Sequence, residues 1–214
     1  MNVEAFIPDW PGPKQHAKEL RNIVDGYCPT TILDDPADYF NAQWRKASNV
    51  LNADILLWIM ADVTLPEKFG TVFREMVRIM NRGDIGWYAP DIAWTCYIYD
   101  EKDLQAIEPR IYNVPNTDSL CFAIRADVVR KMPFIDPAIS YMWGMDFAAI
   151  ATARLMGLKT VRDYRFKAAH PNSTGYDIPK ASREMEKLAQ GYSTELRTEI
   201  KRLVVEVEQL KRKP

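Results

Sequence analysis

The stretch "ILLWIMADVTLPEKF", residues 55–69, decides how the rest of the sequence is interpreted. It begins with seven apolar residues, Ile55 to Ala61, which end on Asp62, and the chain then turns through Pro66. An apolar run of this length is too short for a typical helix and suits a central β-strand covered on both faces. The stretch therefore predicts a strand over 54–62 with a carboxylate at its end.

Around this strand, short apolar runs bounded by turn residues alternate with longer segments of helical period. The alternation is typical of βα units, so the expected fold class is α/β with a mostly parallel sheet. Further strands are expected at 3–8, 30–35, 85–100 (one or two strands) and 159–170, and a strand running into a short helix at 118–132. Helices are expected at 14–27, 38–53, 65–83 and 145–157.

From Ile178 onward the composition changes to charged, helix-favouring residues. Apolar residues recur there at spacings of four and three over about two heptads, at Leu196, Ile200, Leu203, Val207 and Leu210. Two interpretations stay open: a tail helix docked on its own domain, or a coiled coil that forms a homodimer. The sequence is accordingly divided into a domain over 1–175 and a C-terminal helical extension over 176–214.

The composition excludes several classes of protein. A formal net charge of −1 over 214 residues gives no global attraction to nucleic acid or anionic lipid. The three cysteines, Cys28, Cys96 and Cys121, lack the paired spacing of a zinc site or a disulfide framework. The longest apolar run, seven residues, is too short to cross a membrane. We therefore expect a cytoplasmic protein without a transmembrane segment.

Polar residues follow several of the expected strands. In an open parallel sheet, ligands bind beyond the carboxyl ends of the strands. Those positions hold Pro8 to Pro13, Asp34 and Asp35, Asp62, and His170. We expect them to converge on one crevice. Asp62 and His170 resemble an incomplete metal shell, because a carboxylate oxygen and an imidazole suit a divalent ion such as Mn²⁺ or Mg²⁺.

The order of these motifs resembles a nucleotide-diphospho-sugar glycosyltransferase of the GT-A fold, similar to glycosyltransferase family 2. The resemblance covers roughly residues 3–172 and rests on "FIPDWPG", "ILDDPAD", "NVLNADILLWIMADV" in place of the acidic metal motif, "MWGMDFAAIATARLMGLKTV" in place of a Gly-Glu-Asp helix start, and "FKAAHP". It implies a Rossmann-like mixed sheet flanked by helices. It also implies metal-assisted transfer of a sugar from a donor such as a UDP-sugar.

The resemblance also implies roles for individual residues. The nucleotide-sugar would contact Pro8, Asp9, Asp34 or Asp35, Arg45, Asn49 and Ala61, and Asp62 and His170 would hold the metal ion. Asp146 would act as general base or orient the acceptor hydroxyl. Judged from its position alone, Asp146 is equally an N-cap of the helix that follows, and one side chain can do both. Further roles come from the residues themselves: Gly144 would let the backbone approach the donor sugar, Trp143 would stack on a donor or acceptor sugar or fill the core, and Asp118 would face the acceptor.

Two positions depart from the family pattern. Met60 stands at the first acidic position of the metal motif, so metal binding would depend on Asp62 and His170 alone. Met145 stands where a glutamate usually precedes the catalytic aspartate, which removes one carboxylate from the acceptor side.

Several functional alternatives stay open. The acceptor is expected to be a glycan or a lipid-linked glycan, with a modified base in DNA, as in phage-type enzymes, as the alternative. Residues 154–170 hold five Lys/Arg and one Asp, a local charge of +4. Two interpretations stay open: a solvated helix and edge strand, which is the more common case, or a cluster that grips diphosphate or an anionic acceptor. A nucleotidyltransferase would carry a Gly-rich loop after the first strand, whereas "PDWPGPK" has one glycine. The third alternative is a non-catalytic assembly protein with a degenerate pocket.

Overall fold

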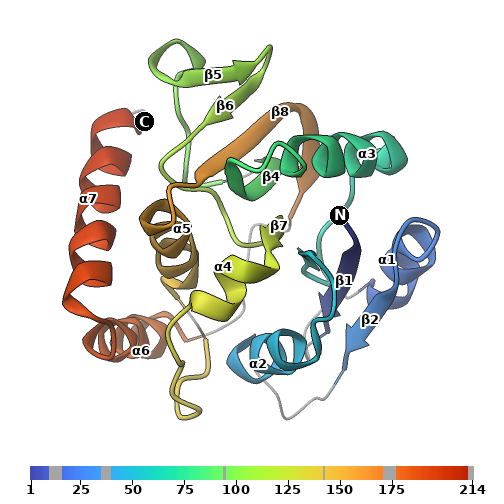
Figure 1. Ribbon diagram of the computed structural model, residues 1–214. Helices are drawn as coiled ribbons and strands as arrows, with labels where there is room; N and C mark the ends of the chain where they lie inside the picture. The colour runs from blue at the N-terminus through green and yellow to red at the C-terminus, as the bar shows by residue number, and fades with distance from the viewer. Residues whose placement is uncertain (10–15, 35–39, 94, 142, 171–176, 212–214) are drawn as a thin grey trace.

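The computed structural model describes residues 1–9, 16–34, 40–93, 95–141, 143–170 and 177–211 (Figure 1). The strands are β1 Val3–Pro8, β2 Thr30–Leu33, β3 Ile55–Ile59, β4 Ile85–Ala93, β5 Gln105–Glu108, β6 Ile111–Asn113, β7 Cys121–Arg125 and β8 Lys159–Ala169. The helices are α1 Ala17–Val24, α2 Phe40–Val50, α3 Phe69–Met80, α4 Ala126–Lys131, α5 Met145–Leu155, α6 Ile178–Gln190 and α7 Thr194–Leu210, with a 3₁₀ turn at Glu101–Asp103.

The strands form one sheet in the order β2-β1-β3-β7-β4-β8-β6-β5. β1 runs parallel to β2 and β3, and β4 runs parallel to β8. β7 lies antiparallel between β3 and β4, and β5 and β6 add an antiparallel hairpin at one edge. The expectation of a mostly parallel sheet was therefore wrong. Two of the four antiparallel pairings among the described strands are made by β7, and the other two by the β5–β6 hairpin and its contact with β8.

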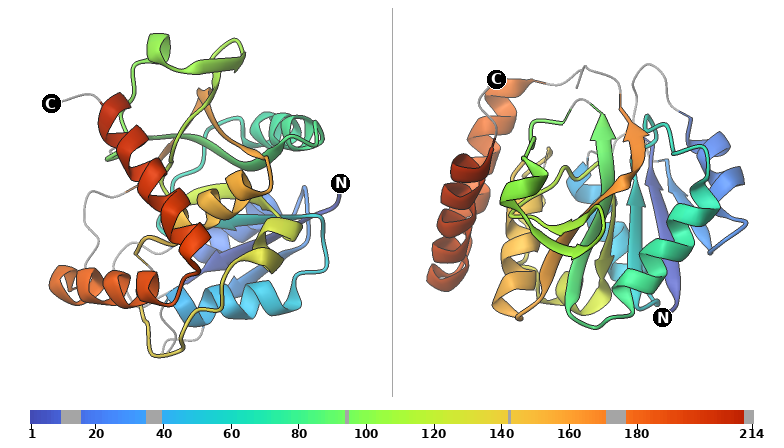
Figure 2. Two further views of the ribbon diagram at one scale, coloured as in Figure 1. Left: turned by 60° about the vertical axis from the view of Figure 1, so that its left-hand side comes forward. Right: turned by 90° about the horizontal axis from the view of Figure 1, so that it is seen from above.

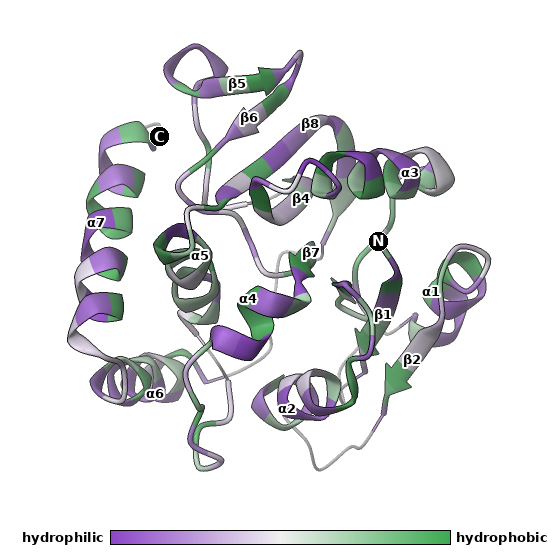
Figure 3. Cartoon of the chain, in the orientation of Figure 1, coloured by the Kyte–Doolittle hydropathy of each residue, from purple (hydrophilic) through white to green (hydrophobic). Residues whose placement is uncertain are grey.

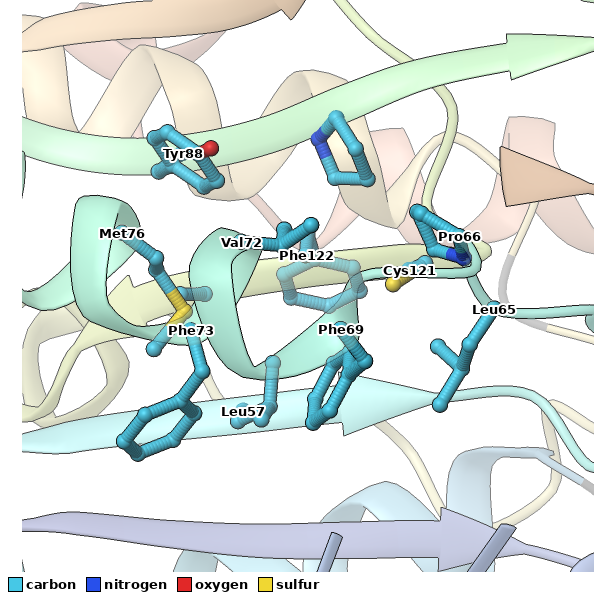
Figure 4. A pocket seen from close by; sticks show the side chains of 12 residues that line it. Leu57, Leu65, Pro66, Phe69, Val72, Phe73, Met76, Tyr88, Cys121 and Phe122 are labelled. Carbon is cyan, nitrogen blue, oxygen red and sulfur yellow. The ribbon is translucent and has the colours of Figure 1, made fainter. Parts of the chain in front are cut away.

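The stretch quoted first forms the centre of this sheet, since every residue of β3 is buried. On one face, Trp58 contacts Trp44 of α2 with ring centroids 5.4 Å apart. On the other face, α3 packs Phe69 and Met76 over Leu57 (Figure 4). The void left under α3 is about 10 Å³, room for one water molecule at most, so this crevice is core packing. Helices cover both faces of the strand, as predicted.

The C-terminal helices α6 and α7 lie along the side of the molecule, next to α5 (Figures 1 and 2). Figure 3 shows hydrophilic and hydrophobic residues mixed along α7, and the buried ones include Leu196, Leu203 and Val207. Arg154 of α5 pairs with Glu199 and Glu206 of α7, at 2.9 and 2.6 Å.

The structure thus has the docked helix: heptad positions that a coiled coil would use are buried inside the chain itself. The expected domain boundary at 175/176 lies outside the described residues. None of the helices in the described part of the chain combines the length and apolarity needed to span a bilayer.

Candidate functional site

The backbone at the carboxyl ends of β1, β2 and β3 is fixed by hydrogen bonds that continue past the strands. The amide of Asp9 donates to the carbonyl of Leu33 at 2.9 Å, and the amide of Ala61 donates to the carbonyl of Pro8 at 3.2 Å. The carbonyl of Ala61 in turn accepts from the amide of His16, just before α1, at 2.8 Å. The turn that carries Asp62 is therefore held by the neighbouring segments.

Asp62 and His170 are brought together by a short antiparallel bridge. Thr64 and Ala169 exchange two backbone hydrogen bonds, of 2.8 and 3.0 Å, which place the end of β8 beside the turn after β3. As a result, Nε2 of His170 lies 3.1 Å from Oδ2 of Asp62. The Asp62 carboxyl is 7% exposed, and its Oδ1 has no hydrogen-bond partner among the described residues.

This pair fits two ligand positions of a divalent ion. Two ligands about 2.1 Å from an octahedral ion and at right angles to each other lie about 3 Å apart, close to the observed separation. The orphaned Oδ1 of Asp62 is a buried acceptor that an ion would satisfy. Within the described residues, no group of three or more His, Cys, Asp or Glu side chains is arranged to hold a metal. Asp62 and His170 are therefore the residues of this site that could hold an ion.

Neither departure from the family pattern is compensated nearby. Met60 and Met145 are each 5% exposed and belong to the hydrophobic core. The positions where the family carries acids are thus used for packing.

Asp146 is held by two side-chain donors. Its Oδ2 accepts from the hydroxyl of Tyr97 at 3.0 Å and from Nδ2 of Asn116 at 2.9 Å. Burial raises the pKa of Asp146, although these two hydrogen bonds oppose the rise, and the nearby charge of Asp118 adds to it. The carboxyl thus lies in a setting typical of a general base, whose pKa must approach the working pH.

Asp118 connects this network electrostatically to His170. Its Oδ2 accepts a short hydrogen bond from the hydroxyl of Thr95. Burial raises the pKa of Asp118, while the Thr95 hydrogen bond and the nearby charges of Arg162 and His170 act to lower it. Asp146, Asp118 and His170 therefore interact electrostatically in one region of the molecule.

The start of α5 corrects the capping interpretation of Asp146. The N-cap of the helix is Gly144, and Asp146 lies inside the first turn. Gly144 has a φ of 83°, and a Cβ there would lie 3.2 Å from Cγ of Met185 in α6. Backbone conformation and packing against α6 are thus sufficient reasons for a glycine at this position. Trp143, just before it, is half-buried.

On the donor side, Asp9 and Asp34 lie close enough to interact. Burial raises the pKa of Asp9, and the charge of Asp34 raises it further. Gln43 of α2 is fully buried and donates through Nε2 to the carbonyls of Asp9 (2.9 Å) and Leu33 (3.1 Å). The ends of β1 and β2 are therefore tied to α2. Asp35 lies outside the described residues.

The other two residues predicted on α2 do not join this group. Arg45 lies over the ring of Phe134, 5.9 Å from its centroid. Asn49 is exposed at the far end of the helix. Shortly after it, the amide of Asn52 donates to the carboxylate of Glu4 near the start of β1, at the amino ends of the strands, opposite to Asp9 and Asp62. The structure therefore does not bring Asn49 to the site.

The cations of residues 154–170 face acids from other elements. The pairs are Arg154 with Glu199 and Glu206, Lys159 with Asp84, Arg162 with Asp91, Arg165 with Asp163 and Glu75, and Lys167 with Asp91. The local charge of +4 is thus offset by Glu75, Asp84, Asp91, Glu199 and Glu206, which lie elsewhere in the sequence, and the structure favours the interpretation without an anionic grip.

Sequence reasoning missed the residues that hold the site in place: Gln43, Thr95, Tyr97, Asn116 and Arg162. Gln43 had a detectable signal, because it lies on the same helical face as Phe40, Trp44 and Ala47 and is polar there. The others come from a loop and a strand whose register no pattern in the sequence reveals.

The comparisons with known proteins concern the fold. No protein-family model matches the sequence, and no curated protein matches it. The structure is similar to that of GalNAc-T7 with UDP, GalNAc and Mn²⁺, a GT-A glycosyltransferase, with a TM-score of 0.61 at 10% identity over 91% of this chain and 48% of that one. The chain thus spans about half the length of that relative. A second similar structure is A197 from STIV, with a TM-score of 0.50 at 16% identity over 80% of this chain and 86% of that one. The chain therefore has the GT-A fold, an α/β mixed sheet flanked by helices, as the resemblance implied.

Proposed function

We propose that the chain is a glycosyltransferase that moves a sugar from a nucleotide-diphospho-sugar, a UDP-sugar in the first instance, to an acceptor hydroxyl with the help of a divalent ion. The observation that supports this most is the pairing of Asp62 with His170, at 3.1 Å, where the ends of β3 and β8 meet. The buried carboxyls of Asp118 and Asp146 interact electrostatically in the same region. The GT-A fold is consistent with this class of reaction.

Asp62 and His170 are the residues that would hold Mn²⁺ or Mg²⁺, with the donor's phosphate oxygens as further ligands. When bound, such an ion offsets the negative charge that develops on the leaving nucleoside diphosphate, worth several kcal/mol. Pro8, Asp9, Asp34 and Ala61 form the edge beside this pair and would border the nucleotide. Gln43 keeps that edge in place.

Asp146 would take the proton of the acceptor hydroxyl, or orient that hydroxyl, on the other side of the site. Tyr97 and Asn116 fix one of its oxygens, so the direction in which the carboxyl acts is set before the acceptor arrives. General-base catalysis of this kind contributes about 10²–10⁴-fold to the rate. Trp143 and Asp118 are the nearby candidates for contact with the sugars.

The test is release of UDP from UDP-sugars in the presence of Mn²⁺. We expect turnover by the wild type, and its loss in Asp62→Ala and in Asp146→Asn. Asp25→Ala, an exposed carboxylate at the end of α1, is the matched control and should leave turnover unchanged. Full turnover in both site variants would contradict the site. Absence of turnover with every donor would instead favour a non-catalytic assembly protein with a degenerate pocket.

A further inference from the structure

A cavity of about 550 Å³ lies beside the acid network and has no role in the mechanism above. Its size falls within the range of small-molecule sites. The residues that characterise its wall are Tyr97, Tyr99, Tyr164, Asp91, Arg162 and Lys167. We call it the tyrosine cavity.

The wall of the tyrosine cavity is built by a bulge in β8. The pairing of β4 with β8 shifts from Pro90↔Asp163 to Asp91↔Lys167, so that Tyr164 belongs to the bulged residues of β8 that have no partner in β4. Pro90 has no amide hydrogen with which to continue the ladder. Bulges of this kind redirect side chains beside active sites. Here the bulge carries Tyr164 and Lys167, both of which line the cavity.

The ring of Tyr164 is supported on two sides. The guanidinium of Arg162 lies over one face, 5.0 Å from the centroid, and the ring of Tyr112 lies at 80° to that of Tyr164 with centroids 5.7 Å apart. Arg162 itself is 2% exposed and is fixed by the carboxylate of Asp91 and the carbonyl of Tyr97. The cavity thus offers a pre-positioned aromatic face next to fixed polar groups.

The lining of the tyrosine cavity has no excess of positive charge. Arg162 and Lys167 both face Asp91, at 2.5 and 4.0 Å. Two further acids of the lining, Asp100 and Glu101, add negative charge. A phosphodiester has no hydrogen to donate to these carboxylates and is repelled by them.

The cavity is in contact with the candidate catalytic groups. Thr95 and Tyr97 belong to its lining, and they donate hydrogen bonds to Asp118 and Asp146 respectively. A molecule bound in the cavity therefore lies next to the side chains that hold the candidate base.

We infer that the tyrosine cavity binds a neutral sugar unit of the acceptor, so that the acceptor is a glycan and not DNA. A sugar ring has a face of C–H groups that packs on an aromatic ring, and hydroxyls around its rim that donate to carboxylates and accept from an ammonium such as that of Lys167. The inference rests on the proposed function for the direction of transfer. Its direct test is binding, which does not need turnover.

The experiment measures binding of neutral disaccharides, namely maltose, lactose, cellobiose and mannobiose, by saturation-transfer NMR titration. Tyr164→Ala removes the aromatic face, and Ile98→Ser changes a lining residue that is 52% exposed. Ile23→Ser on α1, where the side chain is 46% exposed, is the matched control. We expect Tyr164→Ala to weaken binding about fivefold or more, Ile98→Ser to weaken it about twofold or more, and the control to leave it unchanged. Thermal melts establish that each variant is folded.

Three outcomes decide the inference. Wild-type protein that binds none of the disaccharides, or binding that Tyr164→Ala does not weaken, overturns it. A single-stranded thymidine oligonucleotide that displaces the disaccharide from the cavity also overturns it, in favour of a nucleic-acid acceptor. UDP binding with Mn²⁺, measured on the same samples, separates this inference from the proposed function. Sugar binding without UDP binding contradicts only the proposed function. UDP binding without sugar binding contradicts only the inference about the tyrosine cavity.

Discussion

The two halves of the sheet hold their functional side chains in different ways. The first half consists of β2, β1 and β3. Its functional side chains come shortly after the ends of these parallel strands, at Asp9, Asp34 and Asp62, and backbone hydrogen bonds fix the segments of Asp9 and Asp62. In the half formed by β7, β4, β8, β6 and β5, Asp118 and Asp146 come from a loop and a helix and are held by side-chain donors.

Burial raises the pKa of Asp118 and Asp146 in the second half, as it does that of Asp9 in the first. What differs between the halves is therefore how the carboxyls are held: by the backbone at the strand ends in the first half, and by side-chain donors in the second. Because the means are separate, the two halves can be perturbed separately.

The largest effect is expected from Asp146→Asn. The amide cannot accept a proton at working pH, so turnover should fall about 10²–10⁴-fold while the affinity for UDP and Mn²⁺ stays unchanged. Asp62→Ala should instead weaken metal-dependent UDP binding. Calorimetric titration of UDP with Mn²⁺, beside steady-state kinetics, distinguishes the two variants. Equal loss of UDP affinity in both would break the division between the halves.

A smaller effect is expected from Gln43→Ala in the first half. Removing the amide leaves the carbonyl of Asp9 without one donor and opens a space under α2, which should cost about 1–3 kcal/mol in the free energy of unfolding. UDP affinity should fall with it, because the end of β1 loses its tie to α2. Urea denaturation and UDP titration measure the two changes. Exposed Gln105→Ala on β5 is the control, and both quantities should remain at wild-type values there.

The same contrast explains how much the sequence could predict. The strands over 3–8 and 30–33 and the buried strand with Asp62 at its end were predictable, because each is a local run of one period. His170 was predictable as the end of the last strand, but its distance from Asp62 depends on the bridge between Thr64 and Ala169. The β5–β6 hairpin was missed although its strands are neighbours in the sequence. The partners of Asp146 were missed because they lie 49 and 30 residues from it. The structure places Asn49 at the far end of α2, a position that the apolar period of the helix does not indicate.

A pair of glycine substitutions in the second half should give a modest effect. Gly144 and Gly83 both have a φ of 83°, but a Cβ at Gly83 has nothing within 4 Å, whereas at Gly144 it meets Met185. Gly83→Ala should cost about 1–2 kcal/mol from backbone strain alone. Gly144→Ala should cost more, and should also lower turnover, because Asp146 lies in the turn that Gly144 begins. Equal losses of stability in Gly83→Ala and Gly144→Ala would show that α6 shifts to make room for the added Cβ without a measurable cost.

The smallest effect is expected in the pH dependence of stability. The folded-state pKa of Asp146 is raised by burial, so the folded protein holds this proton more tightly than the unfolded chain. Its contribution to stability is complete below the unfolded pKa, near 4, and is lost as pH rises through the folded pKa. Asp146→Asn removes this loss. The free energy of unfolding of the variant minus that of the wild type should therefore increase as pH rises, by at most about 1.4 kcal/mol per pH unit.

Asp127→Asn provides a control of opposite sign, because the hydrogen-bonded Arg125 lowers the pKa of Asp127. The stability that Asp127 contributes is present above the unfolded pKa and is lost as pH falls through the folded pKa. The difference in the free energy of unfolding between Asp127→Asn and the wild type should therefore be constant above about pH 5. Urea denaturation between pH 4.5 and 8 gives both difference curves. A rising curve for Asp146→Asn beside a flat one for Asp127→Asn would support the buried carboxyl as the tuned group of the second half. Two flat curves would mean that Asp146 titrates as an ordinary carboxyl and that the halves differ in architecture alone.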